Sequence, residues 1–396
     1  METPESPETR AARGGWYREF ATRPSTPAIF QTTAFDVDGL EQLDAITTGR
    51  EAGYIYTRDG NPNHEALASD VAALEGAAQG AVFSSGMGAM TATLLALLKS
   101  GDHVVAARVL YGRTAQMLNH LRASFGIEVT YVDGNDPTAF GRVVTPRTQL
   151  AIVETISNPL MEVADLPAIS AGLGQVPLLV DSTFATPCLV KPMQHGAKLV
   201  FHSGSKYLNG HGDVMLGVIV GDTGLVRKIR GIGALYGVNS NPFESWLGSR
   251  GLRTLPLRMT QVCRTADALA RFLTRHPSVL RVYYPGLESH PSHATALKMM
   301  PAGFGGMLAF DLRGGQPAVA RLFRALGETI PFSPTLADTR TTVSYPAGTS
   351  HKFLSAEERA TCGITDGLVR LSIGLEDEPT LRRELGAALD SLGTNE

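Results

Sequence analysis

The chain has 396 residues, of which 43% are hydrophobic and 18% charged, and this ordinary globular composition excludes a largely disordered protein. A formal net charge of −3 gives no reason to expect nucleic acid or an acidic membrane surface as a partner. The N-terminal residues have no apolar signal core, and the longest apolar runs are too short to cross a bilayer, so we expect no membrane segment.

The cysteines and histidines lack the pattern of a cross-linked or metal-binding protein. Cys188, Cys263 and Cys362 lie far apart, which is not the spacing of a disulfide framework. The ten histidines are scattered, and no spacing of His, Cys, Asp and Glu resembles a zinc or iron site. We therefore expect a cytoplasmic protein without a metal.

Residues 1–62 carry little periodic pattern and are punctuated by glycine and proline. Their aromatic residues, among them Phe30, Phe35 and Tyr54, favour packing over disorder. The length of this segment suggests an N-terminal arm that contacts a neighbouring subunit.

Residues 63–250 alternate between helical and strand patterns, which predicts a mostly parallel, seven-stranded sheet covered on both faces by helices. In such α/β sheets, ligands bind outside the carboxyl ends of the strands. The predicted helices are 64–75, 87–99, 114–125 and 164–173, and the predicted strands are 81–83, 104–107, 129–132, 150–153, 178–180, 199–201 and 217–220.

Residues 251–396 have a different pattern, which predicts a smaller C-terminal α+β domain joined to the large one by a long helix. The predicted helices here are 256–274, 317–326 and 380–392, and the predicted strands are 279–284, 306–312 and 368–373.

Residues able to bind an anion follow two of the predicted strands. The stretch Ser84-Ser-Gly-Met-Gly-Ala-Met90 opens a helix, and its glycines let the backbone approach an anion at the positive helix end. A tight turn against the sheet would use the same glycines. Lys206 follows the strand 199–201 together with Ser203 and Ser205, which share one face if the strand continues. Two hydroxyls beside an amine can hold a phosphate near a group that forms a Schiff base, although a solvated lysine is the simpler interpretation.

Four other polar residues lie at strand ends or inside a strand. Asp181 ends an apolar strand and needs a cationic partner such as a pyridinium nitrogen, unless it only caps a turn. Tyr111 and Asn158 follow two further strands, and Arg370 lies inside an apolar strand, where a buried arginine needs an anion. A phosphate cradle, a ring acceptor, an amine and a carboxylate clamp together match pyridoxal 5′-phosphate (PLP).

Motifs spread from about Pro27 to Leu392 resemble the Cys/Met-metabolism family of PLP enzymes, the trans-sulfuration enzymes, and occur in that family's order. They are Tyr56-Thr-Arg58, Ser85-Gly-Met87, Tyr111-Gly112, Ser157-Asn-Pro159, Val180-Asp181, Ser203-Gly-Ser-Lys-Tyr-Leu-Asn-Gly210 and Arg370-Leu-Ser372.

The resemblance implies a PLP-dependent enzyme of fold type I that forms a homotetramer from dimers sharing their active sites. It assigns Lys206 as the Schiff-base lysine and catalytic base, Asp181 as the partner of the pyridine nitrogen, and Tyr111 as a ring-stacking catalytic residue. It also assigns Arg370 to the substrate α-carboxylate. Further cofactor contacts would come from Gly86, Met87, Asn158, Thr183, Ser203 and Ser205, with Tyr56 and Arg58 reaching over from the neighbouring subunit.

The chain departs from the family pattern in the expected substrate pocket. Arg113 replaces a glycine after Tyr-Gly, and Thr335-Leu-Ala-Asp-Thr-Arg-Thr341 replaces Ser-Leu-Gly-Gly-x-Glu-Ser, so that Thr335 keeps a hydroxyl and Arg340 replaces a glutamate. This stretch is more similar to the corresponding stretch of O-succinylhomoserine sulfhydrylases than to that of cystathionine lyases. Two arginines would suit an anionic leaving group or nucleophile. Alternatively, both point to solvent or pair with Asp338.

The main hypothesis is therefore γ-replacement on an O-acyl-L-homoserine by a sulfur nucleophile. The alternatives are γ-elimination on cystathionine or methionine, which gives 2-oxobutyrate and ammonia, and a specialised γ-substitution with a non-sulfur nucleophile. A non-catalytic PLP-binding protein of the same fold is a further alternative from a different class.

Overall fold

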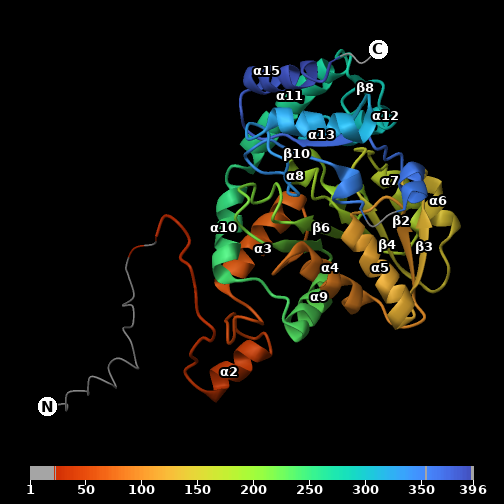
Figure 1. Ribbon diagram of the computed structural model, residues 1–396. Coiled ribbons are helices and arrows are strands. Elements are labelled where there is room, and N and C mark those ends of the chain that lie inside the picture. Colours follow the sequence, from red (N-terminus) through yellow and green to blue (C-terminus); the bar gives the residue numbers. More distant parts are fainter. Residues whose placement is uncertain (1–21, 23, 353–354, 394–396) are drawn as a thin grey trace.

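The computed structural model describes residues 22, 24–352 and 355–393, which form a seven-stranded sheet and a four-stranded sheet with helices packed on them (Figure 1). None of the helices in these described ranges is long and apolar enough to cross a membrane.

The large sheet has the strand order β1-β7-β6-β5-β4-β2-β3. Strands β6, β5, β4, β2 and β3 are parallel neighbours, whereas β7 is antiparallel to both β1 and β6. The predicted α/β sheet is therefore confirmed. Its strands are β1 (Gln79–Phe83), β2 (His103–Ala107), β3 (Glu128–Val132), β4 (Thr148–Glu154), β5 (Leu178–Asp181), β6 (Leu199–Ser203) and β7 (Gly217–Gly221).

Most strands of this sheet are apolar and buried along nearly their whole length, as expected of a parallel sheet covered by helices. Its helices begin with side-chain caps where the sequence offers them, as at Asn61 before α3 and Ser85 before α4. These helices are α3 (Pro62–Glu75), α4 (Gly86–Leu97), α5 (Gly112–Phe125), α6 (Pro137–Arg142), α7 (Leu166–Leu173), α8 (Thr186–Leu189), α9 (Thr223–Tyr236) and α10 (Pro242–Leu252), with a short 3-10 turn at Pro192–His195.

Helix α9 was not among the predicted helices, and its glycines explain why. Gly224, Gly231 and Gly233 lower its helix propensity. Tertiary packing requires one of them, because a Cβ at Gly233 would lie 2.6 Å from the ring of Phe83.

The second sheet is antiparallel, in the order β10-β11-β9-β8, and the predicted α+β arrangement is found. Helix α11 (Leu255–Leu273) leads into it and packs against β8, β9 and α15. The other elements are β8 (Val279–Tyr283), α12 (His293–Met299), β9 (Met307–Leu312), α13 (Gly315–Leu326), β10 (Thr342–Ser344), a 3-10 turn (Pro346–Gly348), α14 (Ala356–Thr361), β11 (Leu368–Ser372) and α15 (Glu378–Asp390).

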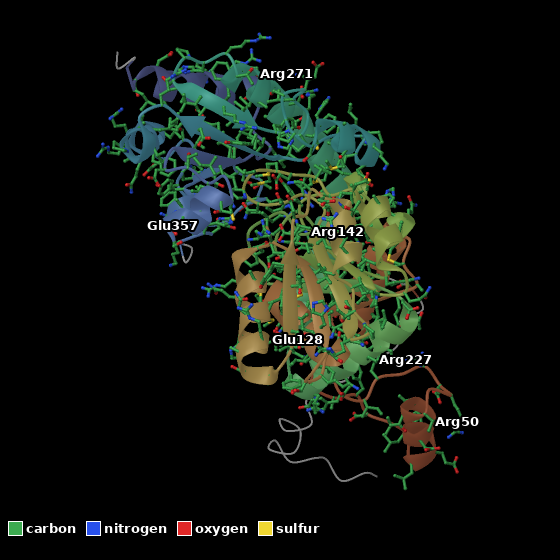
Figure 2. The ribbon with its side chains drawn as sticks, turned by 90° about the vertical axis from the view of Figure 1, so that its right-hand side faces the viewer. Arg50, Glu128, Arg142, Arg227, Arg271 and Glu357 are labelled. Atoms are coloured by element: carbon green, nitrogen blue, oxygen red, sulfur yellow. The ribbon has the colours of Figure 1, made fainter. Side chains whose placement is uncertain are left out.

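Residues 24–50 stand away from both sheets (Figures 1 and 2). They contain helix α2 (Leu40–Thr47), which the sequence analysis did not predict and which has no buried residue. A hydrogen bond from Trp246 Nε1 to the carbonyl of Pro27, 2.9 Å long, ties this segment to α10.

Candidate active site

Polar side chains collect at one edge of the large sheet because its parallel strands end there. Glu154 ends β4, Asp181 ends β5 and Ser203 ends β6, and Glu154 is the register partner of Asp181. Tyr111 follows β2 and is 44% exposed at the start of α5. The structure thus brings together strand ends that are far apart in sequence.

Asp181 is held by Thr183. The backbone N–H and the hydroxyl of Thr183 both donate to Asp181 Oδ1, at 3.0 and 2.6 Å, and Thr183 Oγ1 accepts from the N–H of Ser203 at 2.9 Å. Burial raises the pKa of Asp181, and the hydrogen bonds from Thr183 oppose that rise. A cation beside this carboxylate would stabilise its charged form.

Glu154 is a second carboxyl group at this edge, which the sequence analysis did not single out although it stands in the stretch that holds Asn158. Its Oε1 accepts from the N–H of Tyr111 at 2.5 Å. Burial, followed by the negative charge of Asp181, raises the pKa of Glu154 well above its usual range. Glu154 therefore holds a proton more readily than an ordinary glutamate, while orienting the start of α5.

The first turn of α4 lies directly on the end of β6. Ser85 caps the helix by accepting from the N–H of Gly88 at 2.9 Å. A Cβ at Gly86 would lie 3.2 Å from Ser203 Oγ and from the ring of Phe201, so glycine allows this close approach. The free N–H groups of Gly86 and Met87 together with a nearby hydroxyl form a cradle that suits a phosphate.

Lys206 lies in the turn after β6. The strand ends at Ser203, so the condition under which Ser203 and Ser205 would share one strand face is not met. The chain turns there because the N–H of Lys206 donates to Ser203 O at 3.1 Å, and Ser205 Oγ accepts from the N–H of Leu216 at 2.9 Å. Burial lowers the pKa of Lys206, as does the positive charge of Arg370, whereas the carboxylate of Asp338 raises it.

Arg370 is only 3% exposed on β11, in the second sheet. One guanidinium nitrogen donates to Asn158 Oδ1 at 2.9 Å, whereas Nε has no hydrogen-bond partner among the described residues. Burial lowers the pKa of Arg370 to about 10, which still leaves it charged at neutral pH. A buried cation with an unpartnered donor calls for an anion that the protein itself does not supply.

The two arginines predicted for the substrate pocket are both exposed, and each has a partner of its own. Arg113 donates to Gln116 Oε1 at 3.0 Å, and Arg340 donates to the carbonyl of Glu328. Thr335 lies nearby in sequence, and its N–H donates to Ser333 Oγ at 3.3 Å.

Asp338 lies beside the lysine loop, a position that the sequence analysis mentioned only as a partner for Arg340. A Cβ at Gly212 would overlap Asp338 Oδ2, so the small-domain carboxylate is packed against the loop that follows Lys206. The N–H of Thr339 donates to Asp338 Oδ1 at 2.6 Å and holds the carboxylate there.

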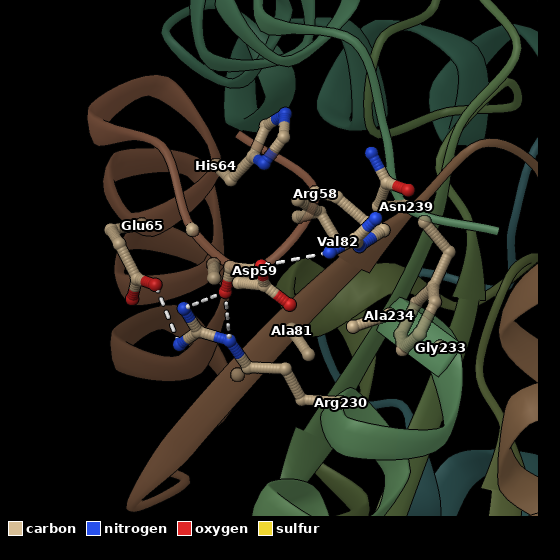
Figure 3. Close-up of a pocket in the computed structure, with 14 residues that line it drawn as sticks. Arg58, Asp59, His64, Glu65, Ala81, Val82, Arg230, Gly233, Ala234 and Asn239 are labelled. Carbon is tan, nitrogen blue, oxygen red and sulfur yellow. Dashed lines mark hydrogen bonds and ion pairs between the residues drawn. The ribbon is translucent and has the colours of Figure 1, made fainter. Parts of the chain in front are cut away.

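Tyr56 and Arg58 do not follow a strand of the large sheet. They lie together on the turn before α3, with the Arg58 guanidinium 4.9 Å from the centre of the Tyr56 ring. Arg58 also lines a cavity with residues of β1, α3 and α9 (Figure 3).

The strand-end cluster fits PLP on two observations: the Gly86 cradle, which a Cβ would fill, and the unpartnered Nε of Arg370. Within the described ranges, no three His, Cys, Asp or Glu side chains gather as a metal site.

The comparison with known proteins agrees with this fit. A profile of the family described as Cys/Met metabolism PLP-dependent enzyme matches residues 8–390. The chain is 41% identical to an L-methionine gamma-lyase of Porphyromonas gingivalis, over 97% of both chains. It is 38% identical to an O-succinylhomoserine sulfhydrylase of Pseudomonas aeruginosa, over 92% of this chain and 91% of the other. The crystal structure of a cystathionine gamma synthase from Xanthomonas oryzae pv. oryzae superposes with a TM-score of 0.89 at 36% identity over the whole of both chains.

Proposed function

Because the chain belongs to the Cys/Met metabolism family of PLP-dependent enzymes, we propose that it catalyses γ-elimination on a methionine-type L-amino acid. Its cofactor is PLP, and reactions of this family are γ-replacements and γ-eliminations on small amino acids. In the proposed reaction, methionine and water give 2-oxobutyrate, ammonia and methanethiol.

The observation that carries this choice is the Asp338 carboxylate next to the Lys206 loop. A fixed negative charge there opposes the anionic tail of an O-succinyl group but not the uncharged methylthio group of methionine. The likeness to an L-methionine gamma-lyase at 41% identity supports the same choice.

The proposed catalytic roles follow from the environments of Asp181, Thr183 and Lys206. PLP supplies an electron-accepting ring, which stabilises negative charge next to the substrate nitrogen. Asp181, aligned by Thr183, faces the ring nitrogen and keeps it protonated. Lys206 binds the cofactor and moves protons at the substrate Cα, which suits an amine whose pKa is lowered by burial and by Arg370.

Other residues bind the substrate and the cofactor and orient them. Arg370 binds the substrate α-carboxylate through the donors that Asn158 leaves free. Tyr111 covers the ring and handles the proton at the leaving group. Gly86, Met87, Ser203 and Ser205 would contact the phosphate, and Asn158 would contact the phenolic oxygen of the cofactor.

A second candidate is γ-replacement on an O-acyl-L-homoserine, the main hypothesis of the sequence analysis. The 38% identity to an O-succinylhomoserine sulfhydrylase and the arginines Arg113 and Arg340 favour it. We place it second because Arg113 and Arg340 already hold Gln116 and the Glu328 carbonyl, whereas the carboxylate of Asp338 lies beside the lysine loop.

A substrate panel tests the choice. We expect 2-oxobutyrate from L-methionine without any added thiol, measured with L-cystathionine and O-succinyl-L-homoserine in parallel. Thioether formed only from O-acylhomoserine and thiol would contradict elimination.

In Asp338→Asn, kcat/KM for O-succinyl-L-homoserine relative to methionine should rise about fivefold, because like charges about 4 Å apart repel by about 1 kcal/mol in water. Asp366→Asn, at an exposed acidic residue just before β11 in the same domain, is the control.

Cofactor attachment has a separate test. Lys206→Ala should lose the visible absorbance band of the bound cofactor together with activity, whereas Lys198→Ala, at the lysine just before β6, should keep both. A band of unchanged position and intensity in Lys206→Ala would contradict the assignment of Lys206.

We also propose the assembly: a homotetramer of cytoplasmic subunits, with an arm (1–62), a PLP-binding domain (63–250) and a small domain (251–396). In each dimer, Tyr56 and Arg58 reach the cofactor phosphate of the other copy, a role supported by their place outside the strands and strand ends of the large sheet. Lys206→Ala and Arg58→Ala chains, each inactive alone, should regain activity when co-assembled, because one site of the mixed dimer is then intact. The absence of a disulfide among the three cysteines suits a reducing cytoplasm.

A further inference from the structure

The turn that carries Tyr56 and Arg58 is tied to helix α9 by one side chain, Arg230 (Figure 3). The N–H of Thr57 also donates to the carbonyl of Thr33, which ties the turn to the preceding segment. Arg230 Nε and Nη2 both donate to the carbonyl of Asp59, at 3.2 and 2.7 Å. Its Nη1 forms an ion pair with Glu65 Oε1, in the first turn of α3, at 2.6 Å. The guanidinium of Arg230 therefore joins three separate segments of the chain.

The turn itself is a compact unit. The N–H groups of Asp59 and Gly60 both donate to the carbonyl of Tyr56, at 2.9 and 3.1 Å. The guanidinium of Arg58 lies over the Tyr56 ring, and one of its nitrogens is 3.4 Å from the Asp59 carboxylate. Because these residues are fixed to one another, the hydrogen bonds from Arg230 to the Asp59 carbonyl orient Tyr56 and Arg58 as well.

The fit between the turn and α9 is close. A Cβ at Gly60 would lie 2.9 Å from Arg230 Nη2 and 3.3 Å from the ring of Tyr54. All three guanidinium nitrogens of Arg230 are engaged by the Asp59 carbonyl and Glu65. Charge-assisted donation from a planar fork fixes direction as well as distance, which a lysine at this position would not do.

We propose that Arg230 and Glu65 are positioning residues, which hold the 56–60 turn so that Tyr56 and Arg58 meet the phosphate of the cofactor bound by a second copy of this chain. This inference rests on the proposed function of Tyr56 and Arg58 as phosphate ligands in trans. Arg230 acts through the turn and does not itself bind the phosphate.

The test compares the affinity of the cofactor-free, full-length enzyme for PLP and for pyridoxal, which lacks the phosphate. Arg230→Met should weaken PLP binding about tenfold, or about 1.4 kcal/mol, and leave pyridoxal binding unchanged. Glu65→Gln, which keeps the bonds to Asp59, should weaken PLP binding less, in the same direction. Arg227→Met, at an exposed arginine of the same helix, is the matched control and should change neither affinity (Figure 2).

A second background separates positioning from a general structural role. In the double variant Tyr56→Phe/Arg58→Ala, adding Arg230→Met should weaken PLP binding by less than about twofold, because both ligands that Arg230 orients are already gone. Equal losses of PLP and pyridoxal affinity, or a full tenfold loss in the Tyr56→Phe/Arg58→Ala background, would overturn the proposal.

The same measurements distinguish the positioning role of Arg230 from the phosphate-binding role of the turn. If Arg58→Ala weakens PLP binding and neither Arg230→Met nor Glu65→Gln does, the positioning role is wrong and the phosphate role stands. If Arg58→Ala leaves PLP affinity unchanged, the phosphate role of the turn is wrong and the positioning role falls with it. Should Arg230→Met fail to fold, Arg230→Lys and Glu65→Gln carry the same comparison.

Discussion

At the scale of single residues, the two carboxyl groups at neighbouring strand ends have different surroundings. Thr183 gives Asp181 two hydrogen bonds, which favour its charged form, whereas Glu154 has one from the backbone of Tyr111 and faces the charge of Asp181. Asp181 is therefore the carboxylate suited to a cation, and Glu154 is the carboxyl group suited to keeping a proton.

The raised pKa of Glu154 predicts how the free energy of unfolding depends on pH. In the folded protein this pKa lies well above the ordinary 4.5 because of burial and Asp181. A group of this kind stabilises the fold fully below its unfolded pKa, and that contribution is lost as the pH rises through the folded pKa. In Glu154→Gln this loss should disappear, so the variant should gain stability relative to the wild type as the pH rises.

The measurement is the urea midpoint of the cofactor-free enzyme across a pH series. Asp181→Asn is the control, because removing the neighbouring charge lowers the folded pKa of Glu154, so that the pH-dependent loss of the Glu154 contribution becomes smaller and ends at lower pH. A constant difference between wild type and Glu154→Gln at every pH would contradict a raised pKa.

At the scale of elements, the first turn of α4 serves both the fold and the site. The cap at Ser85 satisfies one N–H of this turn, while Gly86 brings the turn against Ser203. Ser85→Ala should therefore lower the free energy of unfolding by about 1 kcal/mol and also weaken PLP binding.

The control for Ser85→Ala is Asp136→Ala, which removes the cap that accepts from Thr138 N–H at the start of α6, away from the strand-end cluster. This variant should lose stability without losing affinity for PLP. The two quantities are measured by thermal unfolding and by titration with PLP. Equal effects of the two variants on PLP binding would contradict a specific role for the α4 turn.

At the scale of the whole molecule, the N-terminal arm leaves apolar side chains in solvent within one chain. Leu40 is 83% exposed on α2, and Ile29 and Phe30 are 41% and 44% exposed. Burial of such side chains against a second copy would stabilise the assembly. Leu40→Arg should thus lower the oligomeric mass seen by light scattering and leave the helix content unchanged.

The control for Leu40→Arg is Leu297→Arg, at a leucine that is 52% exposed on α12 of the small domain, away from the arm. It should leave the mass of the assembly unchanged. If Leu40→Arg assembles as the wild type does, the arm does not contact a neighbour through α2.

Much of the fold could be predicted because its signals are local. Apolar strands bounded by polar residues, such as those ending at Asp181 and near Ser203, predict both the sheet and the edge at which a ligand binds. Helix α9 could not be predicted, because three glycines weaken its local signal, and one of them, Gly233, is required by packing against Phe83. Arg230 was missed with it.

The sequence by itself determined the alternation of strands and helices, the residues at the strand ends and, through its motifs, the family. Only the tertiary structure decided which charges face one another: Glu154 with Asp181, Asp338 with the loop after Lys206, and Arg230 with the carbonyl of Asp59. The reason is physical. Strand and helix patterns depend on neighbours a few positions away, whereas electrostatic interactions depend on distances between segments far apart in sequence, such as Arg230 and Asp59, which are 171 residues apart.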